Sequence, residues 1–168
     1  MELRSLSESD MDQALLAQKE LAVDQFDFLL SYDPGDDWTD FLVDLEAIRQ
    51  GRDLSVGRVP ATFLIAEVDG SIVGRVSIRH NLNTFLRTVG GHIGYAVRPQ
   101  FRRRGYAHQI LKLALLEAKR LGIDQVLVTC EADNHASRST IENCGGVREA
   151  PLAADTATTA KLRYWIDT

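Results

Sequence analysis

The sequence predicts an α/β fold, in which a mixed β-sheet of six to seven strands is flanked by about four helices. Three observations lead to this prediction. Stretches with the two-residue period of strands alternate with stretches that have the 3.6-residue period of helices. A helical stretch lies between apolar stretches at residues 92–97 and 125–130, and such a crossover joins parallel strands. The Asp69-Gly70 pair predicts an antiparallel hairpin.

The N-terminal part is predicted to form a short strand at residues 2–6 and two helices. Ser7 or Ser9 caps the first helix, and Asp37 caps a second helix that ends at Gly51. The apolar stripe of the second helix consists of Trp38, Phe41, Leu42, Leu45 and Ile48. The region should therefore cover one face of the sheet with two amphipathic helices.

The middle of the chain is predicted to be mainly β-structure. Residues 61–68 and 71–80 form the two strands of the hairpin, and residues 81–91 form an irregular loop. Residues 92–97 are apolar, aromatic and β-branched, which is typical of a strand, and Pro99 closes it.

The C-terminal part completes the alternation of helices and strands. A helical stripe follows Gly105 and is made of Ala107, Ile110, Leu111, Ala114, Leu115, Ala118 and Leu121. Residues 125–130 form a strand buried on both faces, and residues 134–143 form a short helix. Residues 147–150 and 161–166 are predicted to be a closing strand pair, joined by a loop at 155–159. We expect helices on both faces of the sheet.

The composition is that of one globular domain, spanning residues 1–168. Hydrophobic residues make up 45% of the chain and charged residues 26%. No apolar run approaches the roughly 18 residues that a membrane helix needs, and the first ten residues lack the layout of a signal peptide. We therefore expect a cytoplasmic protein with no membrane partner. Cys130 and Cys144 are too few for a disulfide framework or a metal site, so we expect reduced thiols and no metal.

Charge is distributed unevenly along the sequence. The net charge of −5 argues against nucleic acid as the main partner. Residues 21–48 contain eight acidic residues and neither Lys nor Arg, whereas residues 98–104 contain four arginines and no acid. One part of the chain therefore suits a cationic ligand, and another part suits an anionic one.

The basic segment directly precedes a predicted helix, and this position favours the binding of an anion. Arg102, Arg103 and Arg104 come directly before Gly105. A helix N-terminus has free backbone N–H groups and a partial positive charge, so an anion can bind there. Gly105 has no Cβ, which allows the backbone to approach that anion closely. A bare arginine run would be read as a solvated loop, but its position at a helix start favours an anion site.

The same residues resemble a known family. The run from Arg102 to Ala107 matches the (Gln/Arg)-x-x-Gly-x-(Gly/Ala) motif of the GNAT superfamily of acyl-CoA-dependent N-acyltransferases. It follows a strand that ends in Val-Arg-Pro and opens an amphipathic helix, after which a hydrophobic strand leads to Asn134. The segment that ends at residues 141–146 is similar to the family's Asn…Tyr-Glu-x-x-Gly-Phe segment. The resemblance extends from Ala61 to the C-terminus.

The resemblance implies the GNAT fold, with a splayed pair of parallel strands and acyl-CoA in the gap between them. By this resemblance the backbone of Ala96, Val97 and Arg98 contacts pantetheine, and Asn134 lies near pantetheine or the leaving thiol. The pyrophosphate would be held by Arg102, Arg103, Arg104, Gly105, Tyr106 and Ala107. The expected cosubstrate is acetyl-CoA, and no metal is required.

The resemblance further implies an N-acetyltransferase that transfers an acetyl group to a primary amine by direct attack in a ternary complex. Two alternatives stay open, namely a non-catalytic CoA-binding sensor or partner module, and transfer of a longer acyl group. The acidic N-terminal part would border the acceptor, which suggests a cationic small-molecule or peptide amine. Those acids can equally solvate two helices. Because family members are often dimers, a homodimer is compatible with the sequence.

The catalytic groups depart from the family pattern. The family's usual acid for the leaving thiolate is a tyrosine on the last short helix, where this chain has Ile141. Ser137 is the catalytic candidate in its place, although both Ser137 and Ser139 can also cap or solvate the helix. Cys144 and Tyr164 are further candidates. A thiolate can also leave without an enzymic acid, because its pKa is near 8.5.

His92 is the leading candidate for the base that deprotonates the amine. Its ordinary pKa near 6.5 suits that task, and the period of the strand puts it on the same face as Gly94 and Ala96. A structural hydrogen bond is an equally good explanation for a histidine in a strand. Glu67 and Glu131, at strand ends, are the alternatives.

Overall fold

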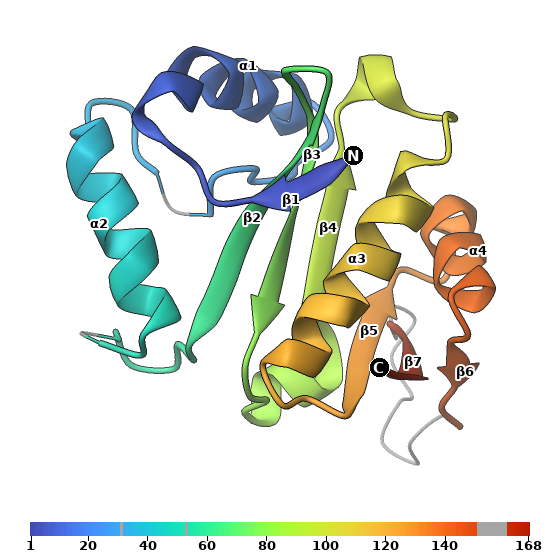
Figure 1. Cartoon of the computed structure of the whole chain (residues 1–168). Coiled ribbons are helices and arrows are strands. Elements are labelled where there is room, and N and C mark those ends of the chain that lie inside the picture. Colours follow the sequence, from blue (N-terminus) through green and yellow to red (C-terminus); the bar gives the residue numbers. More distant parts are fainter. Residues whose placement is uncertain (31, 53, 151–160) are drawn as a thin grey trace.

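A computed structural model describes residues 1–30, 32–52, 54–150 and 161–168 and shows a seven-stranded sheet with helices on both sides (Figure 1). The strands are β1 (Glu2–Arg4), β2 (Ala61–Val68), β3 (Ser71–Arg79), β4 (Ile93–Val97), β5 (Gln125–Cys130), β6 (Val147–Arg148) and β7 (Leu162–Asp167). The α-helices are α1 (Met11–Ala22), α2 (Trp38–Arg49), α3 (Tyr106–Arg120) and α4 (His135–Asn143). The short helical turns are η1 (Glu8–Asp10), η2 (Leu86–Gly90) and η3 (Pro99–Phe101).

The sheet is mixed, and its strand order is β1-β2-β3-β4-β5-β7-β6. The predicted hairpin joins β2 and β3, with Asp69 at φ 49° and Gly70 at φ 76°, the positive values that a tight hairpin turn requires. All neighbouring strands are antiparallel except β4 and β5, which run parallel because α3 crosses over between them. The α/β class and the parallel pair are as predicted.

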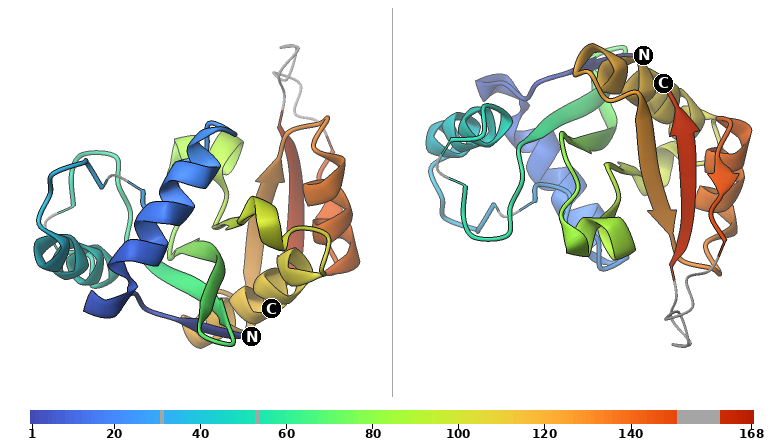
Figure 2. Two further views of the ribbon diagram at one scale, coloured as in Figure 1. Left: turned by 90° about the horizontal axis from the view of Figure 1, so that it is seen from above. Right: turned by 90° about the horizontal axis from the view of Figure 1, so that it is seen from below.

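The helices form two layers, one on each face of the sheet, as Figure 2 shows. Helices α1 and α2 pack on one face, over a core that includes Phe28, Phe41 and Ile65. Helices α3 and α4 pack on the other face, over a core that includes Ile110 and Ile141. No helix in the described part of the chain is both long enough and apolar enough to cross a membrane.

The two parallel strands diverge after a single bridge. Ile93 of β4 pairs with Val128 of β5, and no further pair follows along these strands in the described structure. On its other side, β4 is paired along its whole length with β3, from Ile78 and Ile93 to Gly74 and Val97. The C-terminal half of β4 therefore has one sheet edge that no strand covers.

Several boundaries differ from the predicted ones. Strand β1 ends at Arg4 because the Ser7 N–H donates to Asp10 Oδ2 (2.8 Å), which begins η1. The predicted loop at 81–91 contains the π-helical turn η2, which starts where Asn83 Oδ1 accepts from the Leu86 N–H (2.9 Å). Strand β6 is only two residues long. The predicted loop at 155–159 lies outside the described residues.

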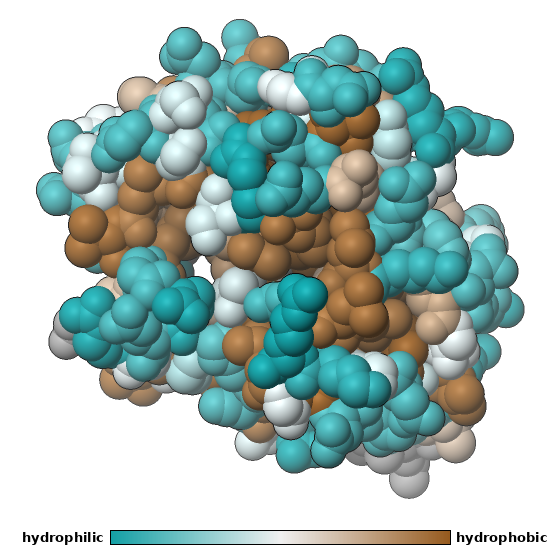
Figure 3. Space-filling view, viewed as in Figure 1, coloured by the Kyte–Doolittle hydropathy of each residue, from teal (hydrophilic) through white to brown (hydrophobic). Residues whose placement is uncertain are grey.

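The outer edge of the sheet is only partly covered. Strand β1 pairs with β2 at Ile65, Ala66 and Glu67, so residues 61–64 of β2 have no outer partner strand in the described structure. Figure 3 shows apolar residues gathered in the middle of this face, between α2 and α3. Uncovered strand edges are sites where other chains can pair, so β1 protects only part of this edge.

Candidate functional site

A cavity of about 770 Å³ lies where β4 diverges from β5. Four parts of the chain line it, namely the end of α1, the second half of β4, the loop into α3, and α4. The lining residues are Leu21, Asp24, Phe26, Tyr95, Ala96, Val97, Phe101, Arg102, Arg103, Gly105, Tyr106, Ala107, His108, Asn134, Ala136, Ser137 and Thr140. The cavity thus touches elements from both helical layers.

The structure brings most of the predicted site residues to this cavity. Those that line it are Ala96, Val97, Arg102, Arg103, Gly105, Tyr106, Ala107, Asn134 and Ser137. Three predicted residues do not line it, and these are His92, Arg98 and Arg104. The second half of β4 and the basic loop before α3 therefore line one cavity, although not every predicted residue does.

The uncovered edge of β4 presents backbone hydrogen-bonding groups to the cavity. The Arg98 N–H donates to Val73 O of the neighbouring strand (2.9 Å). Successive residues of an antiparallel strand point their N–H and C=O groups to opposite sides, so those of Val97 and Tyr95 are directed away from β3. The Val97 carbonyl accepts from Nε of Arg102 (3.1 Å). The N–H of Val97 and both groups of Tyr95 face the gap.

The loop before α3 has the backbone shape of an anion site. Arg103 has φ 61° and Gly105 has φ 78°, so two residues of this short loop are left-handed. Left-handed conformation is unusual for a residue other than glycine and costs about 1–3 kcal/mol, and it is typical of functional loops. Alternating conformations of this kind turn successive N–H groups inward into a concave nest. Helix α3 begins at Tyr106 and adds its N-terminal N–H groups to the nest.

Arg102 fixes this loop in place. Its Nε donates to the carbonyl of Val97, and its Nη2 bonds Oδ2 of Asp24 at 2.5 Å. The ion pair is half-exposed, so it adds less than about 1 kcal/mol to stability. Arg102 therefore ties β4, the loop and the end of α1 together, and its predicted contact with the pyrophosphate stays a prediction.

Arg98 and Arg104 do not line the cavity. The Arg98 guanidinium is buried, 3% exposed, where it bonds both carboxylate oxygens of Glu20 (2.9 and 3.0 Å) and donates to Ile72 O (2.8 Å). Its backbone N–H is engaged with β3, so its position does not support the predicted pantetheine contact. The guanidinium carbon of Arg104 lies 5.7 Å from the ring centre of Phe101.

Tyr95 of β4 lies beside α4, the helix on which Ile141 occupies the position of the family's usual tyrosine. Ile141 is fully buried in the core under α4 and has no polar group to offer. The Tyr95 hydroxyl lies 3.2 Å from Oγ of Ser137, and both residues line the cavity. Burial raises the pKa of Tyr95, so the phenol keeps its proton at neutral pH. Sequence reasoning missed Tyr95, although the two-residue period of its strand puts it opposite Gly94 and Ala96.

Asn134 positions Ser137. Asn134 is the N-cap of α4, and its Oδ1 accepts from the Ser137 N–H (3.0 Å). This bond fixes the first turn of the helix against the cavity. The other candidate acids, Tyr164 and Cys144, do not line the cavity. The Tyr164 hydroxyl donates to Glu142 (3.0 Å), and Sγ of Cys144 lies 3.3 Å from Nδ1 of His108.

His92 lies at the closed end of the gap. Its Nδ1 accepts from the Leu127 N–H (2.9 Å), and its ring packs against Trp165 at 6.4 Å between ring centres. Burial, together with the positive charges of Arg87 and Arg79, lowers the pKa of His92 to about 4. The ring is therefore neutral, and its Nδ1 is hydrogen-bonded to the backbone of β5. This arrangement favours the structural role of His92 over the role of a base. Glu67 and Glu131 pair with Arg4 and Lys161.

Most of the acidic residues predicted to border an acceptor have structural roles. Asp37 caps α2, accepting from the Asp40 N–H (3.1 Å), and Glu46 pairs with Arg49. Asp24 is the one residue of the eight that lines the cavity, and it is paired with Arg102. The acidic segment therefore gives little support to a cationic acceptor.

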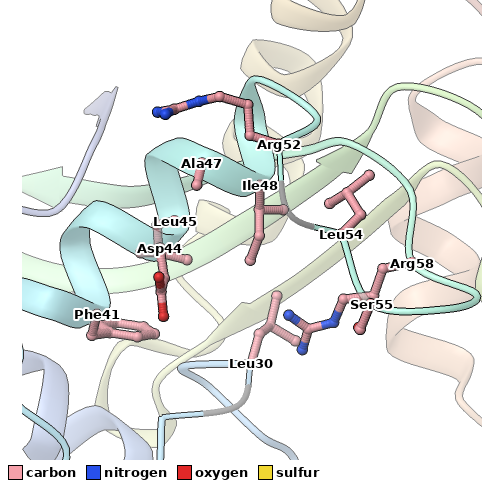
Figure 4. Close-up of a pocket in the computed structure, with 10 residues that line it drawn as sticks. All are labelled: Leu30, Phe41, Asp44, Leu45, Ala47, Ile48, Arg52, Leu54, Ser55 and Arg58. Carbon is pink, nitrogen blue, oxygen red and sulfur yellow. The ribbon is translucent and has the colours of Figure 1, made fainter.

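A second cavity, of about 230 Å³, lies beside α2 (Figure 4). Phe41, Leu45 and Ile48 of the helix form one wall, and the chain from Leu54 to Arg58 forms another. Of the residues predicted from the sequence to bind or react, it is lined only by Asp44, one of the eight acids of the N-terminal part. We therefore assign the chemistry to the larger cavity.

The mixed sheet, the splayed parallel strands and the nest at the start of α3 are the features that the resemblance to the GNAT superfamily implied. The family model described as "Acetyltransferase (GNAT) family" matches residues 20–145. The chain belongs to the GNAT acetyltransferase family, as its motif predicted. A search of curated proteins found no match.

Solved structures of acetyltransferases share the fold. An N-acetyltransferase from Staphylococcus aureus Mu50 is 19% identical, with a TM-score of 0.63 over 99% of this chain and 97% of the other. A putative acetyltransferase from Salmonella typhimurium, solved with its cofactor acetyl-CoA, is 18% identical, with a TM-score of 0.63 over 99% and 92%. A Salmonella typhimurium acetyl transferase that modifies the N-terminal serine of ribosomal protein L7/L12 is 17% identical, with a TM-score of 0.68 over 99% and 94%.

Proposed function

We propose that this protein is an acetyl-CoA-dependent N-acetyltransferase, which transfers an acetyl group to a primary amine by direct attack in a ternary complex. The observation that carries the proposal is the cavity at the splayed edge of β4, which joins an anion-binding helix start to unpaired backbone groups of a strand. A CoA thioester matches both features, because its pyrophosphate can bind at the helix start and its extended amide chain can pair with the strand.

The site would hold the donor mainly through the backbone. The nest formed at Arg103 and Gly105, with the first N–H groups of α3, suits the pyrophosphate. The groups of Tyr95 and Val97 that face the gap suit the amides of pantetheine, which would pair with β4 as an added strand does. Arg103, which lines the cavity, supplies a guanidinium for the phosphates.

The chemistry follows from what surrounds the reacting carbonyl. The amine nitrogen attacks the thioester carbon, the C–S bond breaks, and the electron pair leaves on sulfur. The Val97 N–H can donate to the oxygen that gains charge. The pair of hydroxyls on Tyr95 and Ser137 can donate a hydrogen bond or a proton to the departing thiolate. This role replaces that of the tyrosine whose usual position is occupied by Ile141.

The proton lost by the attacking amine needs an acceptor. His92 stays a prediction for that role, but its position at the closed end of the gap and its neutral, hydrogen-bonded ring do not support it. An amine with a pKa near 10.4 is mostly protonated at neutral pH, so in this proposal the amine loses its proton to bulk solvent before binding and only its small neutral fraction attacks. Cytoplasmic localisation and a homodimer likewise stay predictions.

The proposal is tested by measuring release of the CoA thiol from acetyl-CoA in the presence of a panel of small amines and peptides. Thiol release that depends on an amine, together with an acetylated product by mass spectrometry, would support acetyl transfer. Binding of acetyl-CoA without release from any amine would favour the sensor module instead. A preference for longer acyl-CoA donors over acetyl-CoA would favour the third alternative.

A further inference from the structure

We propose that the acceptor is an amine that also carries an anionic group, a carboxylate or a phosphate, and that Arg75 and Arg79 bind this group over Gly94. The inference rests on the proposed acetyl transfer and names the class of its acceptor. It replaces the cationic acceptor suggested by the acidic N-terminal segment.

The sheet register brings two arginines to one point. Arg75 pairs with Ala96 and Ser77 pairs with Gly94 across the β3–β4 ladder, so Arg75, Ser77 and Arg79 lie on the same face as Gly94. That face is the one covered by α1 and α2. Nη1 of Arg75 donates to Gly94 O at 3.2 Å. A Cβ placed on Gly94 would lie 3.7 Å from Nη1 of Arg79, so both side chains reach Gly94 from opposite directions along β3.

Arg75 is a buried cation whose charge is compensated only in part, because the nearby charge of Asp27 raises its pKa less than burial lowers it. It is 3% exposed, and its Nε has no hydrogen-bond partner within the described structure. Its hydrogen bonds go to the neutral carbonyls of Gly94 and Asp27, and its guanidinium carbon lies 4.6 Å from the ring centre of Phe26. Burial lowers the pKa of Arg75 to about 9. A buried guanidinium whose charge is only partly compensated is strongly stabilised by an anion that binds beside it.

Arg79 adds a second positive charge at the same place. Its Nη1 donates to the carbonyls of Gly90 and Gly91 (3.1 and 3.2 Å), and burial lowers its pKa. Among the described residues Arg79 forms no ion pair with a carboxylate, and Asp27 is the one acidic group whose charge raises the pKa of Arg75. The neighbouring charge of Arg79 also lowers the pKa of Arg75. The local field over this part of the sheet is therefore positive.

Gly94 leaves room for a ligand between the two arginines. Among the described residues, only the guanidinium of Arg79 comes within 4 Å of where its Cβ would be. Gly94 is partly exposed, and the next residues of the strand, Tyr95 and Ala96, line the cavity, as does Phe26 above Arg75. A ligand whose amine reaches the thioester beside Val97 would therefore extend its other end toward Gly94.

A purely structural role does not account for these arginines. Both fasten loops to the sheet, Arg75 through Asp27 O and Arg79 through the end of η2. Carbonyl acceptors satisfy only some of the five N–H donors of each guanidinium, and Asp27 compensates the charge of Arg75 only in part. Neither arginine lines the cavity itself, but Arg75 lies under Phe26 and opposite Ala96, which do line it, so a ligand in the cavity could extend over the sheet to both charges.

The test compares amines that differ only in the anionic group. The common L-amino acids are assayed against their carboxamides, and O-phosphoethanolamine against ethanolamine, at saturating acetyl-CoA with thiol release as the readout. We expect kcat/KM for at least one anionic member to exceed that of its neutral analogue by about tenfold or more. Whichever comparison gives the larger ratio of kcat/KM, anionic over neutral amine, shows whether the site prefers a carboxylate or a phosphate.

Variants assign the preference to the two arginines. Arg79→Gln should lower kcat/KM for the preferred anionic amine about tenfold and leave its neutral analogue within about twofold. Gly94→Ala should have a similar selective effect, because its methyl group would occupy the space over the strand. Arg120→Gln, an exposed arginine at the far end of α3, removes the same charge and should change neither value.

Two results would overturn the inference while leaving acetyl transfer intact. One is a parent protein that prefers the neutral amines, and the other is an Arg79→Gln variant with an unchanged anionic preference. If no amine is acetylated, the proposed function fails, and the melting temperature of the CoA-loaded protein decides the inference. If amino acids or O-phosphoethanolamine raise this melting temperature and Arg79→Gln abolishes the rise, the anion site is supported. If none of them raises the melting temperature, the anion site is refuted.

Discussion

Ile93 of β4 and Val128 of β5 form the one bridge between the two parallel strands in the described structure. Beyond this pair the strands separate, and the hydrogen-bonding edge of β4 is left without a partner strand. The crossover that makes the strands parallel also delivers the N-terminus of α3 to the mouth of the gap. One divergence therefore creates both the groove for an extended ligand and the positive end that can anchor its phosphates.

Arg103 and Arg104 should differ in their effect on donor binding. Arg103 lines the cavity, whereas Arg104 lies beside Phe101 outside it. Arg103→Glu is expected to weaken acetyl-CoA binding at least tenfold, about 1.4 kcal/mol. Arg104→Glu, which changes the net charge equally, should weaken it much less. Calorimetric titration at moderate salt checks this, and equal losses in both variants would mean that general charge, not a guanidinium in the site, attracts the donor.

Removing the Tyr95 hydroxyl should slow the reaction without weakening donor binding. Tyr95→Phe keeps the ring in place but removes the group that faces Ser137. We expect kcat to fall by about tenfold or more, because the thiolate loses its hydrogen-bond donor, while the dissociation constant for acetyl-CoA stays within about twofold.

Tyr164→Phe is the matched control for Tyr95→Phe. It removes a hydroxyl that bonds Glu142 and does not line the cavity, so it should leave kcat unchanged. If Tyr95→Phe turns over as fast as the parent, the thiolate leaves without help from this side chain.

The elements and the backbone part of the site follow from local sequence patterns. The hairpin at Asp69 needs only a turn signal, and the nest at Gly105 needs only a glycine before an amphipathic stripe. Such features depend on a few neighbouring residues, so one sequence predicts them. The strand ends of β1 and β6 were less predictable, because their length depends on how far a partner strand continues.

The side chains of the site depend on contacts between distant residues. Arg98 is sequestered by Glu20, which is 78 positions away, and His92 is held by Leu127, which is 35 positions away. No local pattern contains these pairings. Arg75 illustrates the same limit, because an arginine in a strand is ordinarily read as facing solvent, and only the sheet order shows it buried beneath Phe26.

Arg98 is expected to affect stability and not donor binding. Its buried ion pair with Glu20 links α1 to the sheet, and removing one partner leaves the other charge without compensation. Arg98→Gln should lower the free energy of unfolding by about 3 kcal/mol in urea titrations, and leave the dissociation constant for acetyl-CoA unchanged in the folded protein. Weaker donor binding without loss of stability would instead restore Arg98 to the pantetheine site.

His92 should set how stability, rather than turnover, depends on pH. The folded protein lowers the pKa of His92 to about 4, whereas an unfolded histidine titrates near 6.5. The unfolded chain therefore binds a proton first, so this residue's effect is absent above pH 6.5 and costs stability as the pH falls toward 4. The loss should reach at most about 3 kcal/mol.

Urea titrations between pH 7.5 and pH 4 check the stability effect, and His92→Gln should show a shallower fall, because glutamine has no charge to gain. Its side-chain oxygen can still accept from the Leu127 N–H, so the sheet contact need not be lost. Between pH 6 and pH 8 the parent ring is already neutral, so the shape of the pH–rate profile should match in parent and variant. If His92→Gln instead removes the acidic limb of that profile while acetyl-CoA still binds, the ring accepts the amine proton after all, and the structural assignment is wrong.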